Sequence, residues 1–191
     1  SNDINNETYK EYKMLDEIEL NDGSKWLVIK DSNSSQNYVT IMAKVDYNPA
    51  GGTEKSHDEY FSLTNEYWVN NSNANDIEFA NSKMREYIES KVQNVPVELV
   101  EVEGYKVRLI TIDEIINLER DKWKQGTNEN GEVVYNYNGD SIGTYFNDLA
   151  GGLITMTKSD CKTGYKCTLF YELSVSANTT DKSGIRKAWA Y

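Results

Sequence analysis

The sequence predicts an α+β domain in which antiparallel sheet is combined with two main helices. Short runs of β-branched and aromatic residues are bounded by clusters of Asn, Asp, Gly and Ser, which is the pattern of strands and turns. Two other stretches combine a helical spacing of apolar residues with capping signals. No internal repeat or linker divides the 191 residues. We therefore expect one domain over 18–191, preceded by a polar lead-in over 1–17 with loose helical spacing.

The first strands are expected on either side of a polar cluster at 31–36. Residues 25–30 (KWLVIK) and 38–43 (YVTIMA) are rich in aromatic and β-branched side chains, which favour strands. Together they predict a β-hairpin with a long polar loop. We expect Trp26 in the first strand, and Trp189 near the end of the chain, to be buried anchors of the core.

The first helix is predicted to start near Asn75 or Asp76 and to end before Pro96. Ile77, Met84 and Ile88 lie at helical spacing, so they define one apolar face. Either Asn75 or Asp76 could cap the first turn. Such a stripe is typical of core packing, and the alternative of a cofactor-binding stripe is the less common one.

A second helix is predicted from Ile112 to about Trp123. Thr111 and Glu114 fit a capping box, in which the Thr hydroxyl and the Glu carboxylate satisfy each other's backbone N–H groups. Thr111, Asp113 and Glu114 could also be interpreted as a nucleophile beside acids. Capping accounts for all three without any chemistry.

The remaining strands follow the same alternation of strand and turn. Residues 98–102 (ELVEV) combine acidic and apolar side chains in the manner of a half-exposed strand, and Gly104 is expected to turn them into a second strand over 106–110. The cluster at 128–131 predicts a hairpin turn before a strand at 133–135. Three further strands are expected at 153–157, 167–175 and 185–191.

The charge balance limits the partners of the chain. Twenty Lys and Arg against 31 Asp and Glu give a net charge of −11, and the pI is near 4.6. Nucleic acids and anionic lipid surfaces are bound through Lys and Arg, so neither is expected as a partner. The longest apolar runs are far shorter than the roughly 20 residues needed to span a bilayer. Attachment to a membrane is therefore expected only through an anchor preceding this sequence.

The two cysteines, Cys161 and Cys167, enclose five residues with Gly164 at the centre. A tight turn there would bring the sulfur atoms within bridging distance, and closing so short a loop would contribute about 2 kcal/mol. A disulfide implies an oxidising compartment and hence export. Two reduced thiols are the alternative. A zinc site is a weaker one, because the single histidine, His57, lies far upstream.

Signals for catalysis are scarce. His57 lies in a very polar loop, where a solvated side chain is the ordinary interpretation, and no Gly-rich phosphate loop is present. We therefore expect no enzyme activity and no cofactor. Asp140, Asn147 and Asp148 are candidate calcium ligands or ligand-binding loop residues, since Ca²⁺ prefers oxygen ligands on loops. Asn and Asp also occupy turns for conformational reasons alone.

Several segments resemble one module of exported Gram-positive proteins. The run GSKWLVI at 23–29, followed by VTIM at 39–42, is similar to its "G-x-x-W-x-V-I" and "V-T-L-L" strands. The helix SKMREYIE at 82–89, the segment VRLITIDEI at 107–115 and the closing GIRKA at 184–188 resemble its central helix, its "R-L-L-T-x-E-E" segment and its "G-V-R-P-V" strand. Lys187 departs from the usual proline, and 153–157 lacks a tryptophan that the module often has.

This resemblance, from about Ile18 to Trp189, implies a C-type-lectin-like fold without evident sugar-site motifs. Modules of this family are often ectodomains of type IV pilin-like subunits or of anchored surface proteins. The expected function is a non-enzymatic extracellular domain, on the cell surface or a pilus, that presents loops for adhesion or assembly. Its partners would be pilus subunits or a host or cell-surface protein. The alternative is a carbohydrate-binding adhesin, with a glycan as partner and calcium as a possible aid.

Overall fold

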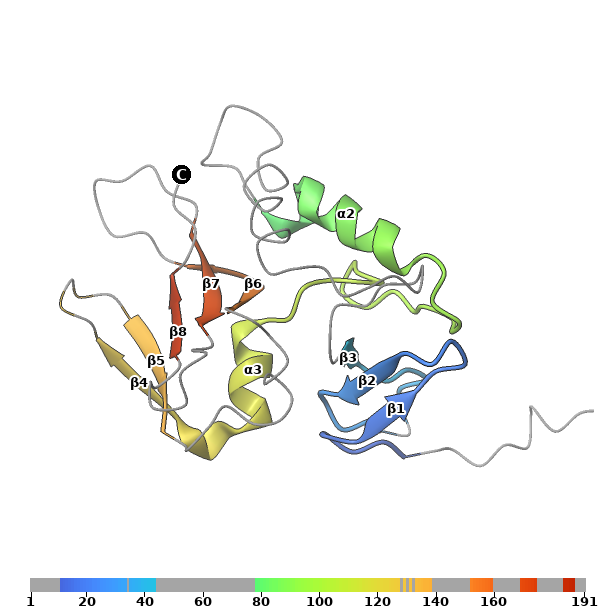
Figure 1. The fold of residues 1–191 in the computed structure, drawn as a ribbon, viewed down its shortest axis with the longest axis horizontal. Coiled ribbons are helices and arrows are strands. Elements are labelled where there is room, and N and C mark those ends of the chain that lie inside the picture. The colour runs from blue at the N-terminus through green and yellow to red at the C-terminus, as the bar shows by residue number, and fades with distance from the viewer. Residues whose placement is uncertain are drawn as a thin grey trace, which may run out of the picture.

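The computed structural model describes residues 11–33, 35–43, 78–127, 129, 131, 133–138, 152–159, 169–174 and 184–187. These residues form two antiparallel sheets and two short α-helices (Figure 1), which confirms the predicted α+β class. The expected loop at 46–75 and the predicted anchor Trp189 lie outside the described residues.

The N-terminal sheet has the strand order β1-β2-β3. Strands β2 (Lys25–Val28) and β3 (Ile41–Ala43) pair antiparallel, with Leu27 opposite Met42, so the predicted hairpin is confirmed. Trp26 is buried, as expected, at 9% exposure. Strand β1 (Glu17–Glu19) pairs with the other edge of β2 and was not predicted.

Residues 11–16 of the lead-in contain no helix, contrary to the expectation. Instead they run beside the end of β2: the Tyr12 backbone N–H donates to Ser32 Oγ at 2.8 Å, and Leu15 N–H donates to the Val28 carbonyl at 2.8 Å. The residues form no helix, despite the loose helical spacing of their apolar side chains, because their backbone groups form hydrogen bonds with β2 and the residues that follow it.

Helix α2 (Lys83–Val92) begins later than the sequence predicts. Ser82 is its N-cap, and its hydroxyl accepts from the Arg85 N–H at 3.2 Å, while a 3₁₀ turn, η3 (Phe79–Asn81), precedes it. The predicted caps at Asn75 and Asp76 are therefore wrong. Met84 and Val92 lie on its buried face.

Helix α3 (Ile112–Leu118) has the predicted capping box but ends before the predicted Trp123. Glu119 leaves the helical region, with φ −144°, and a 3₁₀ turn, η4 (Arg120–Lys122), follows. Trp123 then starts strand β4 (Trp123–Thr127), because its ring packs edge-on against Tyr137 of the neighbouring strand at 5.1 Å.

The C-terminal sheet has the order β4-β5-β8-β7-β6. Its other strands are β5 (Val133–Tyr137), β6 (Gly152–Ser159), β7 (Leu169–Ser174) and β8 (Gly184–Lys187), which confirms the four strands expected there, with shifted ends. The register of β6 on β7 shifts between Ile154 and Lys158. At this bulge the Met156 N–H donates to the Ile110 carbonyl at 3.0 Å, so β6 is tied to the segment that precedes α3.

The predicted hairpin of strands at 98–102 and 106–110 is wrong beyond its turn. Glu103 and Gly104 adopt φ values of +52° and +87°, which suit a two-residue hairpin turn, and Val102 and Tyr105 form a single bridge. No strand continues on either side of that bridge.

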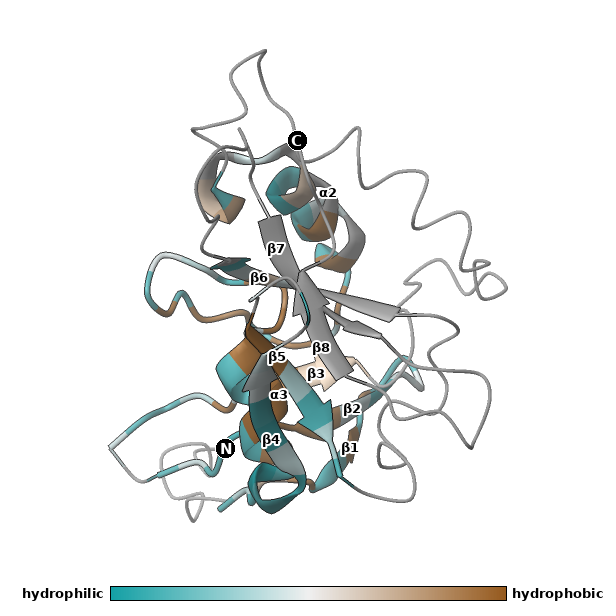
Figure 2. Ribbon diagram, turned by 90° about the vertical axis from the view of Figure 1, so that its left-hand side faces the viewer, coloured by the Kyte–Doolittle hydropathy of each residue, from teal (hydrophilic) through white to brown (hydrophobic). Residues whose placement is uncertain are grey.

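The main core lies around α3, between the two sheets (Figure 1). Its buried residues come from β2 and the residue that follows it, from α3 and the segment just before it, and from β4 and β5. They are Leu27, Ile29, Ile110, Ile112, Ile115, Leu118, Trp123 and Tyr137. Figure 2 shows that α3 has apolar and polar faces, as an amphipathic helix with one buried side should.

Candidate functional site

The candidate site residues taken from the sequence cannot be placed. Asp140, Asn147 and Asp148, the candidate calcium ligands, lie outside the described residues, and so do Cys161 and Cys167. Within the described ranges, no group of three or more His, Cys, Asp or Glu could hold a metal ion. No helix among these residues is long and apolar enough to cross a membrane.

The strongest polar cluster of the described residues surrounds the carboxylate of Glu114. Arg108 donates to it through both terminal nitrogens, Nη1 to Oε1 at 2.5 Å and Nη2 to Oε2 at 2.7 Å. Lys30 Nζ lies 3.0 Å from Oε2. The Thr111 backbone N–H donates to Oε1 at 3.0 Å, and its hydroxyl does so at 3.1 Å. Both carboxylate oxygens of a nearly buried acid are thus fully engaged.

Three separate elements supply this cluster. Glu114 is at the third position of α3, where the capping box turns its side chain back to Thr111. Arg108 comes from the segment that leads into the helix, and Lys30 from the residues just after β2. The cluster therefore joins the N-terminal sheet to α3 by charge as well as by apolar packing.

The pKa of Glu114 is lowered from 4.5 to about 2. Burial alone would raise it, but the hydrogen bonds from Arg108, the Thr111 N–H and Lys30, with the positive charge of Arg108, favour the ionised form more strongly. The hydrogen bond to the Glu114 carboxylate in turn raises the pKa of Arg108. A carboxylate that stays ionised down to about pH 2 cannot exchange protons near neutrality. The geometry suits a structural ion pair rather than a general acid or base.

A second cluster lies at the end of the hairpin of β4 and β5. The Tyr137 hydroxyl donates to Glu119 Oε2, while Lys122 Nζ is 3.4 Å from Oε1 and 6.0 Å from the Tyr137 ring centre. Burial, followed by the bond to the Glu119 carboxylate, raises the pKa of Tyr137 to about 12. This hydroxyl stays protonated and acts as a donor that ties η4 to the sheet.

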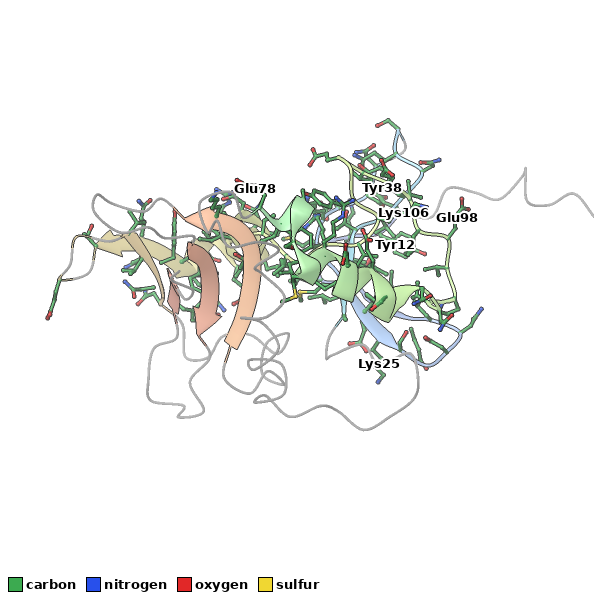
Figure 3. All side chains as sticks on the ribbon, turned by 90° about the horizontal axis from the view of Figure 1, so that it is seen from above. Tyr12, Lys25, Tyr38, Glu78, Glu98 and Lys106 are labelled. Atoms are coloured by element: carbon green, nitrogen blue, oxygen red, sulfur yellow. The ribbon has the colours of Figure 1, made fainter. Side chains whose placement is uncertain are left out.

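The most exposed apolar side chains point to a different kind of site. Two of the three exposed large apolar residues of the described chain, Val97 at 41% and Val100 at 38%, lie in one short stretch between α2 and the turn at Glu103 and Gly104. Glu98 and Glu101, in the same stretch, are also exposed. Figure 3 shows the Glu98 side chain pointing away from the ribbon. We call Val97–Glu101 the valine–glutamate segment.

Arg85 of α2 contacts the residues at which a partner strand for this segment would begin. Its Nη2 donates to the Gly104 carbonyl at 2.8 Å, and its guanidinium carbon lies 4.8 Å from the Tyr105 ring centre. The Tyr105 ring also packs on Phe79 at 5.7 Å. These contacts hold Gly104 and Tyr105 at α2, and within the described part of the chain no strand pairs with the valine–glutamate segment.

The sequence identifies part of these sites. The capping box identified Thr111 and Glu114, but no local signal connects Lys30 to a residue so far along the chain. The combination of acidic and apolar residues at 98–102 indicated a strand. It could not show that Arg85 would hold Gly104 and Tyr105 at α2.

Comparison of the chain with protein-family models, curated proteins and solved structures finds no match.

Proposed function

We propose that this chain is a non-enzymatic extracellular domain of a surface-anchored or type IV pilin-like protein, and that it presents loops for adhesion or assembly. Its partners would be pilus subunits or a host or cell-surface protein, and a membrane would be reached only through a preceding anchor. Within this proposal the two antiparallel sheets and two helices would belong to the C-type-lectin-like class, as the resemblance of the sequence implies.

The observation that carries the proposal is the spacing of Cys161 and Cys167. Five intervening residues with a central glycine suit a short disulfide-closed loop. Disulfides persist in oxidising compartments, so such a loop favours a position outside the cytoplasm.

Charge supports the same proposal. A net charge of −11 keeps a domain soluble and disfavours contact with anionic polymers and lipids. The one strongly shifted carboxylate of the described residues, Glu114, is engaged in holding α3, so its perturbation has a structural cause. Perturbed groups often indicate active sites, but ion-pair networks produce the same shifts.

Mass spectrometry of the natively purified protein tests the compartment. The intact mass before and after reduction, each with thiol alkylation, should show a bridge between Cys161 and Cys167 that disappears on reduction. A Cys161→Ser variant, whose remaining thiol must be alkylated without reduction, is the matched control. Two alkylated thiols in the unreduced wild-type protein would overturn the extracellular assignment.

The surface position has its own test. In the native cells, an antibody against this domain should label intact cells or pili, and a protease added outside should remove the label. Labelling that requires permeabilised cells would contradict the proposal.

A carbohydrate-binding adhesin is the second candidate, because Asp140, Asn147 and Asp148 concentrate oxygen ligands within nine residues. A glycan array should then give hits, and calcium should raise the melting temperature relative to chelator. The variant Asp140→Asn/Asp148→Asn should lose that rise, whereas Asp113→Asn/Asp121→Asn should keep it. No glycan hit and no calcium effect would exclude this candidate.

A further inference from the structure

We propose that the valine–glutamate segment, Val97–Glu101, is a docking surface that accepts an extended basic segment of a protein partner as an added β-strand. This deepens the proposed function by naming a surface for a protein partner, and it rests on that function only in taking the partner to be a protein.

The backbone of the segment is available for pairing. From Glu98 to Glu101 the chain has no helix, turn or bend, and it belongs to neither sheet. Among the described residues, no hydrogen bond involves the backbone N–H or carbonyl groups of Val97–Glu101. An unpaired stretch of β-prone backbone is a template on which another chain can add main-chain hydrogen bonds.

Among the described residues, no strand occupies the position of a pairing strand beside the segment. The turn at Glu103 and Gly104 has the geometry of a hairpin, yet the pairing stops at the bridge of Val102 and Tyr105. Arg85 holds the Gly104 carbonyl and the Tyr105 ring toward α2. The segment thus keeps the composition of a strand without the partner that a hairpin would give it.

The side chains determine which partner fits. Val97 and Val100 are exposed apolar residues that cross-strand apolar neighbours would cover. Glu98 and Glu101 are exposed acids, and Glu103 adds a third at the end of the segment. A second copy of the segment would bring like charges together, which is destabilising. In an extended strand Glu98 and Glu101 lie on opposite faces, so charge complementarity favours a partner that has Lys or Arg three residues apart with β-branched residues between them.

The first test uses a fluorescently labelled hexapeptide, Val-Lys-Val-Val-Lys-Val, and measures its anisotropy as the full chain is titrated at low salt. Saturable binding is expected, and it should weaken as salt is raised. The variant Glu98→Lys/Glu101→Lys should bind roughly ten-fold more weakly, because it converts two attractions into repulsions. Its melting temperature should match that of the wild type, since both side chains are exposed.

The variant Glu86→Lys/Asp121→Lys is the matched control. It changes the net charge by the same amount, from exposed acids on α2 and η4, and should bind nearly as well as the wild type. An equal loss in both variants would show that the peptide responds only to overall charge. That outcome would overturn the proposal, and so would the lack of any saturable binding by the wild type.

The second test asks whether the peptide pairs as a strand. With saturating peptide, amide hydrogen exchange within Val97–Glu101 should slow by roughly ten-fold, while exchange in α2 stays unchanged. N-methylation of alternate residues of the peptide should abolish binding when it blocks the pairing edge and should be tolerated on the opposite set. Binding without local protection, or with indifference to either methylation pattern, would refute strand addition. None of these results depends on the disulfide, so the extracellular assignment stands or falls separately.

Discussion

Replacing Glu114 by glutamine removes the charge at the centre of the main polar cluster while keeping the shape of the side chain. Glutamine can still reach back to the Thr111 N–H, as capping boxes with Gln do, so the helix cap is retained. What is lost is the ionic pairing with Arg108 and Lys30. The substitution therefore isolates the contribution of charge.

The magnitude follows from the pKa of the carboxyl group. In the folded protein it lies at about 2 instead of 4.5, and at 1.36 kcal/mol per pKa unit the difference corresponds to about 3 kcal/mol. Little discount for solvent is needed at the carboxylate, whose side chain is only 4% exposed, although Lys30 at 53% contributes less than its distance suggests. We expect Glu114→Gln to lower the free energy of unfolding by about 3 kcal/mol at pH 7.

The direction of the pKa shift determines how the stabilisation changes with pH. Because the pKa is lower in the folded protein, this stabilisation is fully present above about pH 4.5 and is lost as the pH falls toward about 2. The difference between wild type and variant should therefore shrink to near zero at pH 2. Comparing the two proteins cancels the titration of the other carboxyl groups, which both contain.

Urea unfolding followed by tryptophan fluorescence is the assay, because Trp26 and Trp123 are buried in different sheets. Asp113→Asn is the matched control: it makes the same charge change in the same helical turn at an exposed position, and should alter stability by less than about 0.5 kcal/mol. A loss in Glu114→Gln that is the same at pH 7 and pH 2 would refute the ionic explanation and indicate altered packing instead.

Four further experiments test the fold. Trp26→Ala should cost about 3–5 kcal/mol in urea unfolding, because it empties a buried site, and a curve like that of the wild type would contradict its place in the core. Thr111→Ala should cost about 1 kcal/mol and Thr111→Ser much less, since serine retains the cap; equal losses would argue against capping. Gly104→Ala should cost about 1 kcal/mol in the same assay, because the φ of Gly104 is +87°, a region that side chains disfavour. Lys106→Ala should be nearly neutral. Equal stability of the two variants would show that a side chain at position 104 causes no backbone strain. Cys161→Ser/Cys167→Ser should lower stability by about 2 kcal/mol without unfolding the protein, and reductant should bring the wild type to the same value; insensitivity of the wild type to reductant would exclude a stabilising bridge.

Local patterns were sufficient for the elements whose causes are local. The hairpin of β2 and β3 is predictable because two β-prone runs flank one polar cluster, and the start of α3 because Thr111 and Glu114 satisfy each other's backbone within one turn. The ends of helices were less predictable. Ser82, rather than Asn75 or Asp76, caps α2, and several residues in that stretch are equally suited to capping.

Contacts between distant residues account for the remaining differences. Strand β1 is short and acidic, so it has little strand signal of its own and depends on pairing with β2. The lead-in at 11–16 is likewise held by Ser32 and Val28 rather than by its own spacing. The candidate ligands Asp140, Asn147 and Asp148 and the pair Cys161 and Cys167 stay predictions, since they lie outside the described residues.

The contrast between Glu114 and the valine–glutamate segment shows how function can be separated from stability in this chain. Both carboxylate oxygens of Glu114 accept hydrogen bonds, and these bonds connect α3 to the N-terminal sheet. The role of this side chain is therefore structural. The valine–glutamate segment has apolar side chains, acids and backbone groups that the described fold does not use. Removing charge from the first should therefore change stability and leave recognition intact, while reversing charge in the second should change recognition and leave stability intact. The variants of Glu114 thus test the source of stability, and the variants of the valine–glutamate segment independently test the site of recognition.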